Sequence, residues 1–263
     1  MKKFLAILMV AVMMLSIVAC DLPTEAPSTP SNPSTPSTPS NPPVSGVMTH
    51  AQFLAAETDA PVEIEAYVQA TQSWWDNKIT IYAMDQNYGG YIVYEAACSE
   101  EDAAKLVPGT KINVKGYKTF FGGMPEIASG AELTIIEDAE PFIGYATVMN
   151  DKLGTQELIN ETGAYAAFQG LTVAAIKYKN DTPGDDIYVA FTLGDATYNF
   201  CVERYLTDPE TDLYKGFVDG DVKVGDVVNV YGFVYWYDAD VAPGVASTNP
   251  AGINTHITKI THA

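Results

Sequence analysis

The sequence predicts an all-β protein with short helices, made of two similar modules in tandem. The first observation is that short runs of alternating apolar and polar residues recur between turn residues, which is typical of strands with one buried face. The second is that one of these runs occurs twice, as Pro108 to Tyr117 and as Val224 to Phe233. An internal repeat of this kind indicates a duplicated fold.

The repeated run has glycine, a polar residue, alternating residues and then a second glycine seven positions after the first. The two glycine pairs are Gly109 with Gly116 and Gly225 with Gly232. The first glycine of each pair suits a turn into a strand, and the second suits a bulge or bend where a small barrel turns a corner. The match extends upstream to Thr49 and Thr155, each predicted as the N-cap of a short helix.

In the first module the elements can be placed in order along the chain. The predicted strands are Val62 to Ala70, Lys78 to Met84, Tyr91 to Glu95, Gly109 to Gly116 and Ile127 to Ile136. Residues 85–90 form a predicted hairpin turn between the second and third strands. Ser99 is the predicted N-cap of a helix through Leu106, with acidic residues in its first turn.

The second module follows the same order, with about 12 additional residues that we assign to loops. Its first strand is predicted at Ala166 to Tyr178 and its third near Tyr198 to Val202. Asp208 is the predicted N-cap of its helix, with Pro209 at the first helical position. We therefore divide the folded part into residues 47–140 and 141–263.

The order strand, strand, strand, short helix, strand, strand resembles the OB-fold, a five-stranded barrel whose helix lies between strands three and four. The resemblance covers most of Val47 to Ile260 and depends on the pattern of elements, since no invariant motif is present. It implies two tandem OB-like five-stranded barrels. A β-sandwich built from the same strands is the alternative.

The chain opens with a segment of another kind. Lys2 and Lys3 precede an apolar run, Phe4 to Ala19, which is short for a membrane span and typical of a signal peptide. The run ends in Ile-Val-Ala-Cys at Cys20, which resembles the lipobox of bacterial prolipoproteins. The resemblance implies that residues 1–19 are removed, and that acylated Cys20 anchors the protein at the extracytoplasmic face of the cell membrane. An ordinary cleaved signal with an incidental cysteine is the alternative.

Residues 20–46 are predicted to be the lipidated cysteine followed by a linker. Proline recurs every two to four positions among Ser, Thr and Asn. Such a segment has too few apolar residues to form a core. At about 3.1 Å per residue in the polyproline II conformation it would reach roughly 80 Å, which suits holding a folded domain away from a membrane.

The charge and the chemical motifs limit the function. With 14 Lys and Arg against 33 Asp and Glu, the formal net charge is −19, which makes nucleic acid an unfavourable partner because its affinity comes largely from cations at phosphates. The three histidines lack metal-ligand spacing with one another, and no nucleophile elbow or phosphate loop is present. Cys98 and Cys201 are predicted as buried free thiols rather than a bridge. The sequence predicts no enzyme, no metal and no cofactor.

Aromatic residues gather at the two loops through which OB-folds bind ligands. The candidates are Trp74 and Trp75 between strands one and two, Phe120 and Phe121 between strands four and five, and Tyr235, Trp236 and Tyr237 in the second module. Core or interface packing is the alternative for at least one of the adjacent tryptophans. Counting back by twos from Ile79 and Ile81 predicts that Trp75 faces the core and that Trp74 faces outward.

These features favour a non-enzymatic, lipid-anchored cell-surface protein that binds a protein or glycan, or that is a structural part of a surface assembly. One alternative is an extracellular protein that binds single-stranded nucleic acid, which OB-folds do in other proteins. A second is a hydrolase whose site is not legible in the sequence.

Overall fold

The structure, a computed structural model, describes residues 46–249, 252 and 254–263. The predicted signal peptide, Cys20 and nearly all of the proline-rich linker lie outside the described residues. No helix in the described part of the chain is long and apolar enough to cross a membrane.

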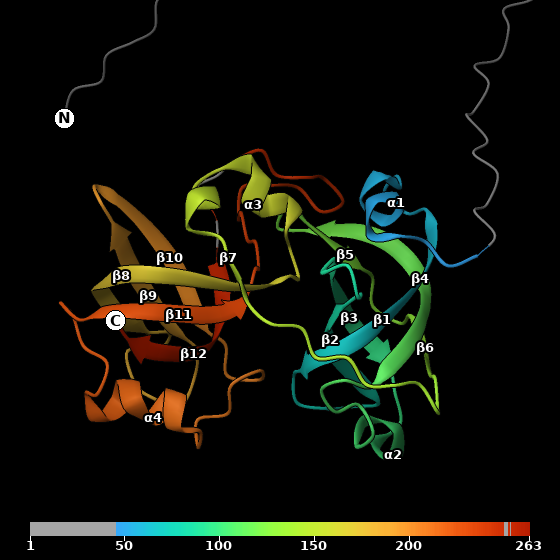
Figure 1. Cartoon of the computed structure of the whole chain (residues 1–263), viewed down its shortest axis with the longest axis horizontal. Helices are drawn as coiled ribbons and strands as arrows, with labels where there is room; N and C mark the ends of the chain where they lie inside the picture. The colour runs from blue at the N-terminus through green and yellow to red at the C-terminus, as the bar shows by residue number, and fades with distance from the viewer. Residues whose placement is uncertain (1–45, 250–251, 253) are drawn as a thin grey trace, which may run out of the picture. The chain divides into compact units, whose positions relative to one another are not determined.

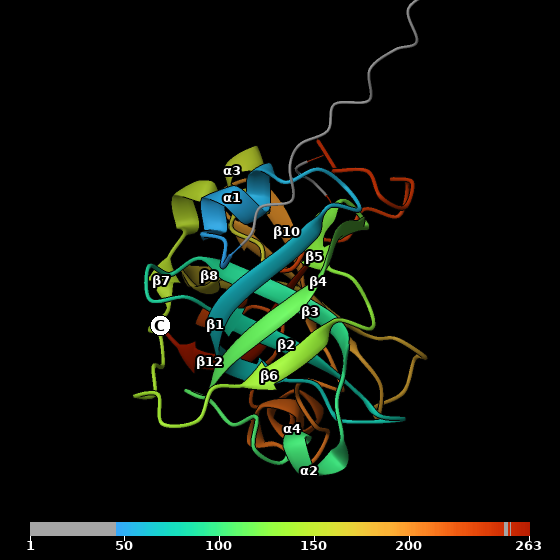
Figure 2. The ribbon, with the colours of Figure 1, turned by 90° about the vertical axis from the view of Figure 1, so that its right-hand side faces the viewer.

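The first sheet is a closed barrel (Figure 1). Its strands are β1 (Pro61–Thr71), β2 (Lys78–Met84), β3 (Gly90–Ala97), β4 (Lys111–Phe121), β5 (Met124–Ile127) and β6 (Glu132–Ile135). Pairing runs from β1 through β2 to β3, then through β6 to β4, and β4 returns to β1 (Figure 2). Because β5 also pairs with both β3 and β4, β5 and β6 together occupy the place of one interrupted fifth strand. Helix α1 (His50–Ala55) precedes β1, and α2 (Glu100–Ala103) lies between β3 and β4.

The second sheet has the same connectivity. Its strands are β8 (Tyr165–Tyr178), β9 (Ile187–Leu193), β10 (Ala196–Val202), β11 (Val227–Phe233) and β12 (Asn254–His262), with the short β7 (Thr147–Val148) beside β8. Pairing runs from β8 through β9, β10, β12 and β11 back to β8. The helical segments are η1 (Asn150–Lys152), α3 (Gln156–Asn160) and α4 (Asp212–Asp219), the last between the third and fourth strands of the ring. The fold is therefore all-β with short helices, in two tandem OB-like barrels, as predicted, and not a β-sandwich.

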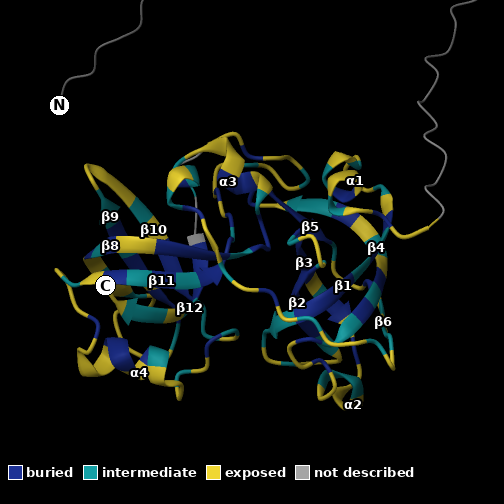
Figure 3. Cartoon of the chain, in the orientation of Figure 1, coloured by how far each residue is buried: buried dark blue, intermediate teal, exposed yellow. Residues whose placement is uncertain are grey.

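Alternation along the strands forms the two barrel cores (Figure 3). In β1 every second side chain from Val62 to Val68 is buried, and these pack with residues of β2, β3 and β4 in one apolar cluster. The second barrel has its own cluster, which includes Phe168, Phe191 and Phe200. Burial of these apolar faces is the main favourable term in folding.

The two predicted glycine pairs occupy matching positions. Gly109 and Gly225 both have φ of +96° in the turn before the fourth strand of each barrel, a conformation that favours glycine. A Cβ at Gly232 would lie 2.1 Å from the carbonyl oxygen of His256, and the register of β11 on β12 shifts there. Gly116 lies in a regular ladder instead, and its Cβ would meet Ile127 at 2.8 Å.

Two of the predicted helix caps form in the first barrel. Thr49 and Gln52 make a capping box at α1, and the Ser99 hydroxyl accepts from the backbone N–H of Asp102 at α2. Helix α2 ends at Ala103, three residues before the predicted end at Leu106.

The predicted caps of the second barrel differ from the structure. Thr155 occupies the N-cap position of α3, but its hydroxyl donates to the carbonyl oxygen of Lys152. Asp208 is not the cap of α4, because its side chain and carbonyl accept from Glu210 and Thr211 and close a separate turn. The helix then starts at Asp212, with Thr211 as its N-cap.

The two barrels contact one another through the outer face of β2, β3 and β5. Tyr82, Ile92 and Met124 point away from the first barrel's core and belong to the apolar cluster of the second barrel. The Tyr82 hydroxyl lies 2.7 Å from Nδ1 of buried His256. A Cβ at Gly90 would lie 2.1 Å from the backbone nitrogen of Ala164, so the two backbones are in direct contact.

The segment between β11 and β12 also crosses to the first barrel. Backbone hydrogen bonds join Asp238 to Gly122 (2.8 Å), Gly244 to Phe120 (3.0 Å) and Ser247 to Gly123 (3.1 Å). This segment, which the structure describes over residues 234–249 and 252, is called the crossing loop below.

Candidate functional site

The two adjacent tryptophans lie at the tip of the β1–β2 hairpin. Trp75 and Lys78 exchange backbone hydrogen bonds of 3.1 and 2.9 Å, and the two residues between them, Asp76 and Asn77, have φ of 48° and 59°. Two central residues with positive φ are typical of the tight turns that join twisted antiparallel strands. The chain therefore continues past the end of β1 at Thr71 to the turn that leads into β2 at Lys78, and it presents Trp75 at the tip.

The prediction that Trp75 faces the core and Trp74 faces outward is wrong, because the two environments are exchanged in the structure. Trp74 packs against the first barrel's core, and its indole N–H donates to the carbonyl oxygen of Cys98 at 2.9 Å. Trp75 is 58% exposed. Counting back by twos from Ile79 crosses the turn at 76–77, where the alternation stops. Residues opposite one another in a hairpin share a face, so Trp75 lies on the face of Lys78 and not on that of Ile79.

Three further exposed rings form a contiguous aromatic row, defined as Tyr94, Phe121 and Tyr237. Each is 41 to 50% exposed. The Tyr94 and Phe121 centroids are 6.4 Å apart with nearly parallel planes, and the Phe121 and Tyr237 centroids are 5.7 Å apart. Tyr94 is on β3 and Phe121 ends β4, while Tyr237 comes from the crossing loop. A Cβ at Gly122 would lie 2.6 Å from the Tyr237 ring, so glycine there allows this close approach.

A pocket of about 440 Å³ lies between the hairpin tip and the row, and is called the hairpin pocket below. It is lined by Trp75, Tyr94 and Tyr205, by the polar residues Gln72, Ser73, Lys78, Thr80 and Glu95, and by Ile79. Tyr94 belongs to both the pocket and the row. The two features therefore form one continuous surface.

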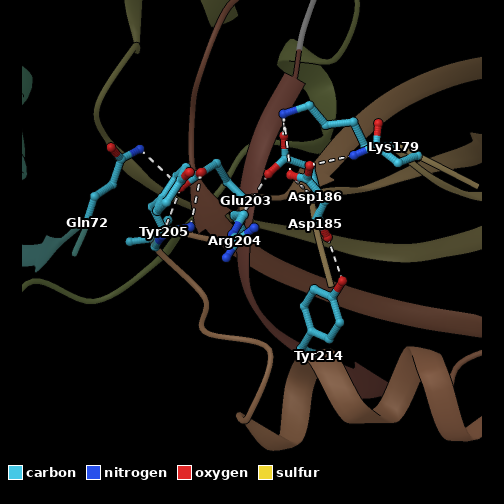
Figure 4. A network of polar contacts seen from close by, with 10 residues as sticks. Gln72, Lys179, Asp185, Asp186, Glu203, Arg204, Tyr205 and Tyr214 are labelled. Atoms are coloured by element: carbon cyan, nitrogen blue, oxygen red, sulfur yellow. Dashed lines mark hydrogen bonds and ion pairs between the residues drawn. The ribbon is translucent and has the colours of Figure 1, made fainter. Parts of the chain in front are cut away.

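Tyr205 lines this pocket from the second barrel, and Figure 4 shows it beside Glu203, with Gln72 on the other side. Its backbone N–H donates to the Glu203 carboxylate at 3.1 Å, and Gln72 of the first barrel donates to the same carboxylate at 3.1 Å. The backbone N–H of Ser73 donates to the carbonyl oxygen of Tyr205 at 2.8 Å. Burial raises the pKa of Glu203, although the backbone N–H donors of Tyr205 and Leu206 oppose that rise. Glu203 thus holds Gln72 of the first barrel and Tyr205 of the second barrel in fixed positions at the pocket.

Two glutamates near the pocket have opposite electrostatic environments. Burial acts to raise the pKa of Glu95, but hydrogen bonds from Lys78 (3.1 Å) and Ser129 (3.1 Å) outweigh it and lower the pKa. Glu126 on β5 is 4% exposed, and burial together with the Glu95 charge raises its pKa to about 8. Glu126 does not line the pocket, so the pair offers no two accessible carboxylates for acid–base work there.

The seven candidates from the sequence have different environments. Trp75, Phe121 and Tyr237 are exposed on the common surface, whereas Trp236 is fully buried. Phe120 is half-buried beside the Lys118 ammonium, 4.9 Å from its ring centroid. Tyr235 stacks on His256 with centroids 3.8 Å apart. The other four candidates, Trp74, Phe120, Tyr235 and Trp236, therefore pack within the protein.

Two residues of the surface, Tyr94 and Tyr205, were not predicted. Alternation in β3 carries a signal for Tyr94, because Tyr91 and Val93 face the core and Tyr94, the position after Val93, is therefore expected to face outward. No local pattern marks Tyr205, whose place depends on contact between the barrels. Cys98 and Cys201 are buried and unbridged, and in the described part of the chain no group of three or more His, Cys, Asp or Glu could hold a metal ion.

No family model and no curated protein matches the chain. Among solved structures it is similar to a Leishmania major Friedlin protein assigned as an aspartyl-tRNA synthetase (15% identity, 48% of this chain but only 22% of that one, TM-score 0.31). It is also similar to a murine DNA-binding protein bound to double-stranded DNA (12% identity, 76% of this chain and 96% of that one, TM-score 0.38). A third is a replication protein A heterotrimer bound to single-stranded DNA (10% identity, 66% and 44%, TM-score 0.28). At these values the similarities carry no argument about function, and the fold is defined by the strand pairing described above.

Proposed function

We propose that this chain is a non-enzymatic, lipid-anchored protein of the cell surface, and that the aromatic row and the hairpin pocket bind an extracytoplasmic protein or glycan. The observation that carries the proposal is the continuous exposed surface formed by Trp75, Tyr94, Phe121 and Tyr237. Large apolar side chains that are held together in solvent are typical of interaction sites. Aromatic rings in such sites supply contact area at little cost in side-chain entropy.

The position of this surface supports the same proposal. OB-folds bind ligands at the loop between strands one and two, the loop between strands four and five, and the face of strands two and three. Trp75 is in the first of these loops, Phe121 adjoins the second, and Tyr94 is on the third strand. Lys78, the one cation among the described lining residues of the pocket, is paired with Glu95. A net charge of −19 further disfavours phosphate ligands.

The proposal is tested with Phe121→Ala and Tyr237→Ala in the full chain, with Tyr145→Ala as an exposed aromatic control outside this surface. The probes are immobilised neutral and acidic polysaccharides, envelope protein fractions and a single-stranded oligothymidylate. We expect at least one polysaccharide or protein probe to bind, and both row variants to weaken that binding at least about tenfold, or roughly 1.4 kcal/mol. Tyr145→Ala should bind normally. Oligothymidylate as the preferred ligand, or a ligand indifferent to both row variants, contradicts the proposal.

The anchoring part of the proposal rests on the lipobox alone and has a separate test. Cys20→Ala should abolish acylation and move the protein from the membrane fraction to the soluble fraction, because stable anchoring depends on the buried acyl chains. Fractionation with radiolabelled palmitate measures both effects. Unchanged membrane partitioning of the variant contradicts anchoring through Cys20 and leaves the proposed binding surface unaffected.

A further inference from the structure

We infer that the hairpin pocket is a binding subsite for an uncharged sugar residue, built jointly by the two barrels, and that the ligand of the surface is a neutral glycan. This inference rests on the proposed binding function and specifies the ligand class. It is carried by the pocket's size, its walls, its charge balance and its rigid construction.

The walls of the pocket suit a ring with apolar faces and polar edges. Trp75, Tyr94 and Tyr205 present three aromatic side chains to a volume of about 440 Å³. The C–H faces of a sugar ring pack on such rings, while its hydroxyl groups point sideways. A pocket with aromatic walls and a few placed polar groups is the usual form of a small-molecule site.

The polar groups suit hydroxyl groups better than charges. Lys78 and Glu95 lie 3.1 Å apart, with side chains 38% and 19% exposed, so both can be reached from the pocket. An ammonium has three donors and a carboxylate has about four acceptor sites, so both keep hydrogen-bonding capacity beyond their mutual contact. Neighbouring sugar hydroxyls can donate to Glu95 and accept from Lys78 at once. An anionic ligand would instead be repelled by Glu95 and a cationic ligand by Lys78, and either would compete with the Lys78–Glu95 ion pair.

The pocket is also held in shape before any ligand arrives. Gln72 and Ser73 of the first barrel hydrogen-bond to the Glu203 carboxylate and to the Tyr205 backbone of the second, at 3.1 and 2.8 Å. Trp75 is fixed by the tight turn at 76–77. A site formed in advance loses less conformational entropy when it binds.

A polymer bound in the pocket has a route outward. Tyr94 forms both the pocket wall and the start of the aromatic row. The ring centroids from Tyr94 through Phe121 to Tyr237 follow one another at 6.4 and 5.7 Å. Sugar residues adjoining the one in the pocket would therefore meet further aromatic rings, which favours a chain over an isolated monosaccharide.

The test is a calorimetric and fluorescence titration of the full chain with neutral oligosaccharide series (gluco-, xylo-, manno- and chito-oligosaccharides) and with oligogalacturonate. At least one neutral series is expected to bind and to shift the indole emission, and oligogalacturonate is expected not to bind. Trp75→Ala and Tyr205→Ala should each weaken binding at least about tenfold. Trp75→Phe should retain most of the affinity while losing the emission change. Tyr145→Ala is the matched exposed control.

The outcomes separate this inference from the proposed function. If a ligand depends on Phe121 and Tyr237 but not on Trp75 or Tyr205, the pocket is not its subsite and the inference fails while the proposed function stands. If the row binds only protein probes and no oligosaccharide competes, the ligand class is overturned. Absence of binding by every neutral series overturns it as well. Because Trp75 and Tyr205 are both exposed and come from different barrels, misfolding of one variant, seen by circular dichroism, leaves the other to decide.

Discussion

At the hairpin tip, two identical side chains next to one another in sequence have opposite energetic roles. Trp74 adds to the core of the first barrel and satisfies the Cys98 carbonyl. Trp75 is directed to solvent and to the pocket. The difference arises from the turn at 76–77, since a position one residue along a hairpin arm changes face.

Alanine substitutions should therefore separate the pair. Trp74→Ala should lower the free energy of unfolding by about 2–4 kcal/mol, because it removes partly buried apolar surface and leaves a carbonyl without its donor. Trp75→Ala should change it by no more than about 0.5 kcal/mol. Urea unfolding followed by circular dichroism measures both. Equal losses would contradict the assigned environments.

Glu126 makes stability depend on pH. Its folded pKa of about 8 is above the usual carboxyl value, because of burial and then the Glu95 charge; Tyr94 and Tyr235 are the other titratable neighbours. The folded protein therefore keeps a proton that the unfolded chain releases, so this group's contribution is full below about pH 4.5 and is lost as pH rises to about 8.

Glu126→Gln should remove this dependence. The variant's advantage in unfolding free energy over the unmodified protein should grow between pH 4.5 and 8, reaching on the order of a few kcal/mol. Thermal unfolding at pH 4.5, 6 and 8 checks the slope. Glu132→Gln, at an exposed position on β6, is the control and should show a small, constant difference. A constant difference for Glu126→Gln as well would refute the buried-acid assignment.

Among the elements, the β1–β2 turn shows how far local chemistry determines structure. Asp76 and Asn77 both have positive φ, and Asn and Asp adopt this region more readily than other residues with side chains. Asn77→Gly should match or exceed the natural stability, whereas Asn77→Ala should cost about 1 kcal/mol, since alanine is strained at this φ. Denaturation midpoints of the two variants test the ranking at one position. Equal denaturation midpoints for Asn77→Ala and Asn77→Gly would show that the turn is not tight.

The strands could be predicted where their signal is local. The span of β2 was predicted correctly because Lys78 to Met84 alternates between two turns. The fifth strand was predicted as continuous, yet β5 and β6 are separate, with Gly130 at φ +83° between them.

The candidate site could likewise be predicted only in the parts that have a local signal. Phe121 and Tyr237 could be named from composition at loops, but their contact depends on the crossing loop, which no local pattern places on the first barrel.

At the scale of the whole molecule, the two barrels share apolar surface. Tyr82, Ile92 and Met124 are buried against the second barrel, and each fully buried large apolar side chain contributes roughly 1.5–3 kcal/mol. A fragment of residues 47–140, which the sequence predicts to fold alone, should keep its β signal but unfold at a lower urea concentration than the intact chain. Circular dichroism of fragment and full chain compares the midpoints. Coincident midpoints would mean that the contact adds no stability.

The crossing loop also sets how many ligands one chain can hold. In the second barrel the two aromatic residues that follow its fourth strand, Tyr235 and Trp236, are turned inward against His256 and the apolar cluster. Duplication of the barrel has therefore not duplicated the row, and the described part of the chain is monovalent for any ligand of that surface. Under the proposed function, strong attachment to a repetitive polymer would then have to come from many copies of the chain held close together. If the proposed anchoring at Cys20 holds, avidity would multiply a modest affinity per chain, and the number of anchored copies per membrane area would then determine how strongly a polymer is held.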